Sequence, residues 1–563
     1  IAGDGLGVFQ VESDGMRGLL IRLKPNCLDD LIALVALYRP GPLSSGMVDD
    51  FIDRKHGRQA VSYAFAELEP ILSNTYGTIV YQEQVMQCAQ VLAGYSLGEA
   101  DLLRRAMGKK DAAEMGRQKE RFVAGSTAAG HDPQKASDLF DLLAKFAEYG
   151  FNKSHSAAYG FIAYQTAWLK ANHRAEYMAA LMTIDCGDSD KVLLYAGDCR
   201  KAGIKILNPD VNESVGPFDV PANDRNSIRF GLSAVKGIGS GAVDAIVEAR
   251  KAGRFLDFMD VLRRVDAGRV NKKVWESLIK CGALDQFGEP RARLFAAMED
   301  AMAAAGVEQA QKASGQASLF GGAAAKSPAF RMPTVPEWSV GERMKMEKEA
   351  LGFFLTGHPV HDYVSEIDSF NFKRIGELAT VALPDPKDRW KRKDADGGLA
   401  VCAIIVGKRI IKTKKGDPMA FVTFEDPDGT IDGVMFKDVL DKCSAMLNAQ
   451  KPVSVRGAIE QQEGKSRTLR VDSIELMEDV RERLVTRVEL HLRAEMLDDE
   501  HVKLLHELVS QNTGSCRTRF FVESAAQFRA ELRVGRSWSV KATPKLVEGV
   551  RALFGREALR LYA

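Results

Sequence analysis

The chain has 563 residues, more than one hydrophobic core usually organises, so several domains are expected. Lys and Arg (77) almost balance Asp and Glu (76), which excludes a protein that holds nucleic acid by overall basic charge and leaves only local patches for that role. The eight cysteines form no Cys-x-x-Cys pair and no long apolar run occurs, so neither a zinc module, a disulfide framework nor a membrane span is indicated. This cysteine usage is typical of the reducing cytoplasm.

The first third of the chain, residues 1–204, is predicted to be mostly helical. Apolar residues recur at helical spacing in residues 28–38, 99–110, 135–150 and 163–183. The first of these segments ends at Arg-Pro-Gly-Pro, where the prolines cannot continue a helix.

The segment NKSHSAAY (152–159) concentrates Lys153, Ser154 and His155 directly after a glycine that ends a helix. These residue types suit either a nucleophile with its base or a set of donors for an anion. A Ser–His nucleophile needs a group that orients the histidine and an oxyanion hole, and the local sequence supplies neither. A metal ion would need further ligands at suitable spacing. A cradle for a polyphosphate is preferred, with a buried structural histidine as the alternative.

The segment LRRAMGKK (103–110) contains four cations and no acid. A solvated helix face is the ordinary interpretation of such a run. Apolar neighbours nevertheless place part of it close to the packed body of the domain. Since adjacent helical residues point about 100° apart, one of Arg104 and Arg105 can face a ligand while the other braces its surroundings.

The sequence pattern changes in residues 205–310, where short β-like runs precede the segment VKGIGSGAVDAIVEAR (235–250). This segment predicts a helix, a turn through Gly237 and Gly239, and a second helix. Glycines let the backbone approach a ligand closely, and the amides from Ser240 and Gly241 onward can point at a DNA phosphate without contacting bases. A helical hairpin that serves only packing is the alternative.

Residues 311–340 are predicted to be a flexible linker, because Ala, Gly, Ser and Lys dominate AQKASGQASLFGGAAAKSPAF. Within it, QASLF spans Gln316 to Phe320 and holds the apolar pair Leu319–Phe320, which is hard to explain as core. It is interpreted as an anchor for an apolar pocket on a partner, an accidental dipeptide being the alternative. A helical connector, 341–394, follows.

Residues 395–480 alternate strands and turns, and five short strands with a helix before the fourth match a five-stranded OB-type barrel. Phe421 and Phe424 are candidate platforms for bases or, alternatively, core residues. The first hairpin carries five cations that are expected to follow a single strand by charge: Lys408, Arg409, Lys412, Lys414 and Lys415. Residues 481–563 predict a small α/β domain with the strands RVELHL, RTRFFVE, WSVKA and ALRLY and the helices EHVKLLHELVSQ and KLVEGVRALFG. The expected fold class is therefore multidomain α+β.

Seven segments in this order resemble one family, the catalytic α subunits of bacterial DNA polymerase III, which are C-family replicative polymerases. They lie between residues 7 and 363 and read GVFQVES, LVALYRPGPL, DFIDRKHGR, YGTIVYQEQVM, LRRAMGKK, YGFNKSHSAAY and GHPVHDY. The resemblance implies a DNA-directed DNA polymerase whose fingers, residues 1–204, face the incoming dNTP or the primer-template. Arg104, Arg105, Lys153, Ser154 and His155 would make these contacts.

The resemblance also implies partners. Residues 205–310, a helix-hairpin-helix region, would hold duplex DNA, and the barrel of residues 395–480 would hold the single-stranded template. Gln316, Ala317, Ser318, Leu319 and Phe320 would bind the sliding clamp (β). Residues 481–563 would bind the clamp-loader τ subunit, and a proofreading exonuclease subunit would join the complete enzyme.

The family uses paired Mg²⁺ ions held by palm aspartates, and no PDxDxDF-like segment occurs in this chain. The pairs Asp188/Asp190 and Asp426/Asp428 are interpreted as turns. The chain is therefore expected to be the C-terminal half of an α subunit, without palm or phosphoesterase-like segments, catalytically inactive by itself and without a metal site. A non-catalytic scaffold that binds DNA and the clamp is the alternative.

Overall fold

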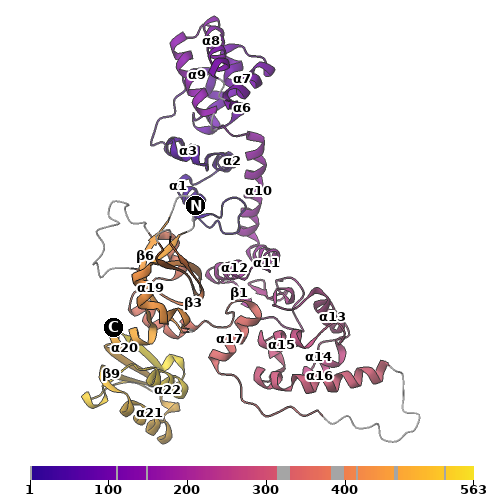
Figure 1. Cartoon of the computed structure of the whole chain (residues 1–563), viewed down its shortest axis with the longest axis vertical. Helices are drawn as coiled ribbons and strands as arrows, with labels where there is room; N and C mark the ends of the chain where they lie inside the picture. Colours follow the sequence, from indigo (N-terminus) through magenta and orange to yellow (C-terminus); the bar gives the residue numbers. More distant parts are fainter. Residues whose placement is uncertain are drawn as a thin grey trace. The chain divides into compact units, whose positions relative to one another are not determined.

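The computed structural model describes residues 3–109, 112–147, 150–313, 330–381, 399–413, 416–449, 451–461, 467–524 and 528–563 (Figure 1). The chain divides into two compact units, Ile1–Met178 and Ala179–Ala563. Among the helices in these ranges, none combines the length and the apolar character that crossing a bilayer requires.

Unit 1 is helical and contains two apolar cores. Its helices are α1 (Asp14–Leu23), α2 (Leu28–Leu37), α3 (Pro40–Ser44), α4 (Met47–Lys55), α5 (Glu69–Leu72), α6 (Gln82–Ala93), α7 (Leu97–Lys109), α8 (Ala112–Ala128), α9 (Pro133–Ala147) and α10 (Lys153–Asn172). One core lies among α5–α9, and the other joins α1, α2 and α4 to Val80 and Tyr81. Val80 and Tyr81, which pack in the second core, directly precede α6, which packs in the first.

The prediction of one helix over residues 163–183 is wrong in two respects: the helix begins earlier, and it ends within this range, where a second helix follows. Helix α10 begins at Lys153, because the Asn152 side chain accepts a hydrogen bond from the His155 amide and so caps the helix. It ends at Asn172, and His173 leaves helical geometry (φ −137°, ψ 52°) before α11 (Arg174–Ile184).

Helix α10 is fixed along its length. At Gly160 it approaches α2 so closely that an added Cβ would lie 2.9 Å from Ile32 Cγ1 and 3.1 Å from Ile32 Cα. Near its C-terminal end, the buried Lys170 pairs with Asp4 and donates a hydrogen bond to the carbonyl of Leu6. The helix is thus anchored at its middle and at its last turns.

Unit 2 begins with helices and a two-stranded parallel sheet. These elements are α12 (Ser189–Lys201), β1 (Lys205–Leu207), β2 (Ser227–Arg229), α13 (Ser240–Arg250), α14 (Phe258–Arg264), α15 (Lys272–Lys280), α16 (Arg291–Ala313), α17 (Val340–Leu351) and α18 (Val364–Ser369). The expected first helix before the GIGSG turn is only the 3₁₀ turn Leu232–Ala234. The second helix, α13, starts as predicted.

A closed barrel follows with strand order β3-β4-β5-β7-β6. Its elements are β3 (Leu399–Lys412), β4 (Pro418–Asp426), β5 (Gly429–Met435), α19 (Lys437–Cys443), β6 (Val453–Glu460) and β7 (Thr468–Leu476). Alternate residues of each strand point inward, as Ala420, Val422 and Phe424 do on β4. The five strands and the helix before the fourth confirm the predicted OB-type barrel.

The C-terminal domain is preceded by α20 (Met477–Leu484) and has a four-stranded sheet in the order β10-β9-β8-β11. Its elements are β8 (Arg487–Arg493), α21 (Asp499–Gln511), β9 (Thr513–Ser524), β10 (Phe528–Arg533), α22 (Pro544–Phe554) and β11 (Leu559–Tyr562). The predicted strand WSVKA is wrong, since only Val540 bridges to β9, and the strand FRAELR (528–533) was not predicted. The multidomain α+β fold class is confirmed.

Candidate nucleic-acid interface

The first turn of α6 brings the two cation-bearing segments of unit 1 together. Arg104 Nη1 on α7 donates to Gln82 Oε1 at 3.2 Å. Gln82 Nε2 in turn donates to the carbonyl of Gly150 at 3.2 Å, and the Gln82 amide donates to the carbonyl of Phe151 at 3.0 Å. Arg104 and the start of α10 therefore flank one helical turn, although they lie about fifty residues apart in the sequence.

Both arginines of α7 have an acidic partner, which lies just before residues 104–110 in the sequence. Asp101 Oδ1 lies 2.8 Å from Arg104 Nη2, and Asp101 Oδ2 lies 2.8 Å from Arg105 Nη2. The hydrogen bond from Arg104 is the main reason that the pKa of Asp101 lies below its usual value. The i,i+3 and i,i+4 spacing could have revealed these pairs from the sequence. Arg105 remains 62% exposed at its side chain.

Lys153, Ser154 and His155 form the first turn of α10, and an internal carboxylate already binds there. Glu83 Oε2 accepts the Lys153 amide at 2.9 Å, and Glu83 Oε1 accepts Asn152 Nδ2 at 3.0 Å. A helix N-terminus attracts anions through its free amides and its dipole. Glu83 thus occupies part of the position that a phosphate would take, a role that the sequence did not indicate.

The side chains of this turn remain accessible. His155 is exposed, so the alternative of a buried structural histidine is wrong, and its ring lies 4.3 Å from that of Tyr159. Ser154 is also exposed. Lys153 Nζ lies 5.4 Å from the centre of the Tyr81 ring, and no carboxylate of the described residues pairs with it. An anionic ligand can therefore reach the ammonium without first displacing an acid from it.

The start of α13 is open to solvent. Gly239 caps the helix without a side-chain hydrogen bond, and the amides of Ser240 and Gly241 have no acceptor within the described part of the chain. A Cβ added at Gly239 or Gly241 would meet nothing within 4 Å. Gly237 has φ 83°, a conformation that favours glycine, and an added Cβ would lie 3.7 Å from Lys273 Cε.

Lys273 was not singled out from the sequence, yet it contributes an exposed ammonium beside this turn. No acid among the residues that the structure describes pairs with it, whereas its neighbour Lys272 pairs with Glu299. Two free amides and one ammonium at a glycine turn suit a backbone phosphate of DNA.

The barrel presents a row of side chains across four strands on its outer surface. Arg409 on β3 lies opposite Phe421, Phe421 lies opposite Val434 on β5, and Val434 lies beside Arg470 on β7. Phe421 is 37% exposed, whereas Phe424 is fully buried, so Phe424 is a core residue, as its alternative interpretation expected, and Phe421 stays a candidate platform. A guanidinium beside an accessible ring is an arrangement that binds single strands.

Of the other predicted cations of the barrel, two lie within the described residues, whereas two more and the predicted anchor lie outside them. Lys408 and Lys412 are exposed on β3, and Lys408 donates a hydrogen bond to Asn448. Lys414 and Lys415 lie outside the described residues. So does the whole QASLF segment, with Gln316, Ala317, Ser318, Leu319 and Phe320.

No group of three or more His, Cys, Asp or Glu side chains in the described ranges could hold a metal ion. Asp188 caps α12 by accepting from the amides of Asp190 and Lys191. Asp426 accepts from the amides of Ile375, Asp428 and Gly429, and burial raises its pKa to about 6. Both aspartates therefore serve local backbone structure.

Three sequence families match parts of the chain. The bacterial DNA polymerase III alpha subunit finger domain matches residues 2–130, a helix-hairpin-helix motif matches residues 203–294, and an OB-fold nucleic acid binding domain matches residues 400–477. The second and third matches contain the open start of α13 and the barrel.

The chain is also similar to curated bacterial proteins named DNA polymerase III subunit alpha. The protein of Pseudomonas aeruginosa is 43% identical over 575 residues, which cover 98% of this chain and 48% of the relative. The proteins of Vibrio cholerae and Escherichia coli K12 are each 40% identical, over 98% of this chain and 47% of the relative. The chain spans about half the length of the curated relatives it matches. Along nearly its entire length the chain is therefore similar to one half of the bacterial DNA polymerase III alpha subunits, and residues 2–130 match the finger domain of this family.

Proposed function

We propose that this chain supplies the nucleotide-facing and DNA-binding parts of a DNA-directed DNA polymerase, which adds deoxynucleotides to a primer 3′-end during chromosome replication. The observation that carries the proposal is the arrangement around α6, where Gln82 links Arg104 to the start of α10. Arg104, Arg105, Lys153, Ser154 and His155 then contact the triphosphate of the incoming dNTP or the adjacent primer-template. Charge-assisted donors of this kind are the usual partners of phosphate oxygens.

The other parts of the chain divide the remaining contacts between them. The amides of Ser240 and Gly241, with Lys273, hold a phosphate of the duplex, and the Arg409–Phe421 surface of the barrel holds the single-stranded template. Residues 316–320 bind the sliding clamp and residues 481–563 bind the clamp-loader τ subunit, while the complete enzyme also recruits a proofreading exonuclease. The protein acts in the cytoplasm.

Nucleotidyl transfer of this kind uses Mg²⁺, which orients the primer 3′-hydroxyl and stabilises the leaving pyrophosphate. The described residues do not fit such a site, since no acidic cluster of sufficient size lies among them. The palm aspartates expected from the resemblance would have to come from another segment. We therefore assign no catalytic step to a residue of this chain.

Primer extension by the protein joined to an upstream palm segment tests the proposal. Loss of one charge-assisted contact costs about 1.5–3 kcal/mol, so Lys153→Ala is expected to lower kcat/KM for dNTP roughly 10- to 100-fold. Arg104→Ala should act in the same direction, with a melting curve to confirm that losing its contacts to Asp101 and Gln82 leaves the fold intact. The control is Lys119→Ala, which removes an exposed pair with Asp141 on α8 and α9. Normal extension by both Arg104→Ala and Lys153→Ala would contradict the assignment.

A second candidate is a non-catalytic scaffold that binds DNA and the clamp, and the open start of α13 favours it because it needs no metal. This chain alone should then bind primer-template with an affinity that falls steeply with salt. Deletion of residues 316–320 should abolish clamp binding and leave DNA binding unchanged. Clamp affinity that survives the deletion would refute the anchor.

A further inference from the structure

Helices α21 and α22 cover one face of the C-terminal sheet. The even-numbered residues of β8, Val488, Leu490 and Leu492, are buried in a core with α21 and α22. Because side chains alternate along a strand, the odd-numbered residues of β8 and their partners in register lie on the opposite face. We call this opposite side the open face.

The open face is rich in arginine. It carries seven arginines, Arg487, Arg493, Arg517, Arg519, Arg529, Arg533 and Arg560. Only three glutamates share it, Glu489, Glu523 and Glu531. These acids pair with Arg487, Arg519, Arg529 and Arg533. Arg493, Arg517 and Arg560 have no carboxylate partner in the part of the chain that the structure describes, so the face has a surplus of positive charge.

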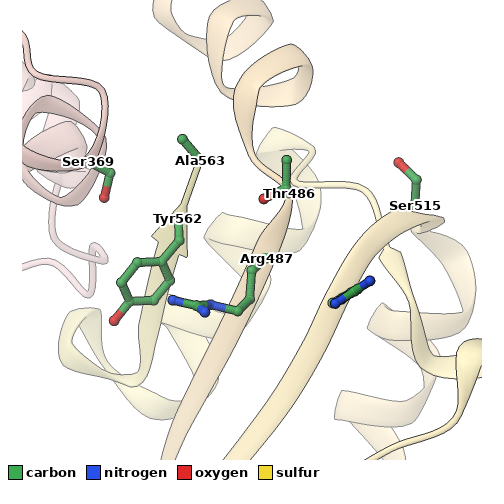
Figure 2. A pocket seen from close by; sticks show the side chains of 7 residues that line it. Ser369, Thr486, Arg487, Ser515, Tyr562 and Ala563 are labelled. Atoms are coloured by element: carbon green, nitrogen blue, oxygen red, sulfur yellow. The ribbon is translucent and has the colours of Figure 1, made fainter.

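A pocket of about 520 Å³ lies at one end of this face (Figure 2). Its lining consists of Ser369, Thr486, Arg487, Ser515, Arg517, Tyr562 and Ala563. Arg487 and Arg517 are direct neighbours in the register of the parallel strands β8 and β9. Two guanidinium groups and four hydroxyl-bearing residues in this lining are donors for a phosphate.

Aromatic rings accompany the arginines. The Arg487 guanidinium lies 4.4 Å from the centre of the Tyr562 ring. Figure 2 shows these two side chains next to each other. His491 and Phe521, neighbours in register on the open face, stack with ring centres 4.7 Å apart and planes 13° apart. Sheet faces that combine cations with partly exposed rings bind single strands by stacking bases. An acidic peptide would need the charges but not the rings.

We propose that the open face of the C-terminal sheet binds single-stranded nucleic acid, with a backbone phosphate held between Arg487 and Arg517 and bases on Tyr562 and the His491–Phe521 pair. This activity goes beyond the proposed protein partner of residues 481–563. It also adds a second single-strand surface to that of the barrel. The chain would then hold one strand at two separate places.

Fluorescence anisotropy of labelled oligo(dT) with the full chain tests the proposal. Barrel binding is first weakened by Arg409→Ala and Phe421→Ala, and the remaining affinity is measured. Adding Arg487→Ala and Arg517→Ala should lower that affinity at least about 10-fold. The slope of log affinity against log salt should become shallower by about 0.7, since the one phosphate held between these two arginines contributes about 0.7 in a single strand. Phe521→Ala should weaken binding without changing the slope.

The control is Lys545→Ala, which removes an exposed ammonium of α22, on the covered side of the sheet, and should have no effect. Photo-crosslinking of thiothymidine-substituted oligo(dT) gives an independent measurement and should label peptides of β8 and β9. Unchanged affinity of the double arginine variant, with its melting temperature preserved, would overturn the proposal. Crosslinks confined to the barrel would also overturn it. So would a double arginine variant that loses affinity for poly-glutamate but not for oligo(dT), because that result would indicate an acidic protein partner. Primer extension does not enter this test, so its outcome is independent of the proposed polymerase function.

Discussion

The close contact between α10 and α2 makes Gly160→Ala a sharp test of the helix packing in unit 1. Carbon atoms in ordinary contact lie about 3.5–4.0 Å apart, whereas the new Cβ would lie 2.9 Å from Ile32 Cγ1 and 3.1 Å from Ile32 Cα and N. The two helices must therefore separate by roughly 0.5–1 Å. A well-packed interface resists such an insertion at a cost of about 1–3 kcal/mol.

The same substitution also favours the helix, and the two effects must be compared. Alanine stabilises a helix interior by about 1 kcal/mol relative to glycine. The net effect at Gly160 is thus a loss of about 0–2 kcal/mol. Gly116 on α8 is the matched control, because an added Cβ there meets nothing within 4 Å. Gly116→Ala should stabilise by up to about 1 kcal/mol.

Urea unfolding gives the two free energies, and hydrogen exchange of peptides from α2 and α10 gives the local effect. Gly160→Ala should unfold at lower urea than Gly116→Ala and should lose protection in α2 and α10. Adding Ile32→Ala removes the Cγ1 contact but leaves the Cα and N contacts, so recovery should be partial. If Gly160→Ala proves as stabilising as Gly116→Ala, the inferred helix contact is incorrect.

Three further substitutions follow from other sites. Glu366 and Arg481 form a buried ion pair. Glu366→Gln should therefore lower the free energy of unfolding in urea by about 3–5 kcal/mol, because it leaves the Arg481 charge buried and unpaired. A smaller loss in the double variant Glu366→Leu/Arg481→Met would confirm that the unpaired charge is the cause. Burial lowers the pKa of His358, so the unfolded chain takes up the proton first and stability should fall as the pH drops below about 6.5. His358→Gln should show a smaller loss between about pH 7.5 and 5.5, and an equal loss would point to other groups. Lys273→Ala should weaken duplex binding and make its salt slope shallower by about one, while an unchanged slope would remove Lys273 from the interface.

The barrel could be predicted because its signals are local. Strict alternation of apolar residues and the Asp428–Gly429 turn specify β4 and β5 without any knowledge of distant contacts. The same rule failed at residues 538–542, where alternation is present but only Val540 bridges to a strand. The alternation was overlooked at β10, where Phe528, Ala530 and Leu532 alternate with charged residues, and the two larger apolar side chains are exposed.

The start of α10 could not be predicted by the same means. Its residues are apolar on more than one side, since Phe161, Tyr164 and Trp168 are exposed while Ala163 is buried. No polar face therefore marks the helix in the sequence.

The candidate site was only partly accessible to sequence reasoning. Asp101 could have been found, because it precedes Arg104 and Arg105 by one helical turn. Glu83 could not, since it reaches the start of α10 across 70 residues of sequence. Long-range contacts of this kind depend on the tertiary fold, which local periodicity does not encode.

The anchoring of α10 has a mechanical consequence. The helix has 20 residues and is about 30 Å long, and Gly160 lies about 10 Å from Lys153 and about 15 Å from Lys170. If α10 rotated by about 10° about Gly160, its Lys153 end would move by about 2 Å and its Lys170 end by about 2.6 Å in the opposite direction. Because Lys170 binds Asp4 and Leu6, a displacement of the first turn of α10 would also move residues 4–6, in the opposite direction.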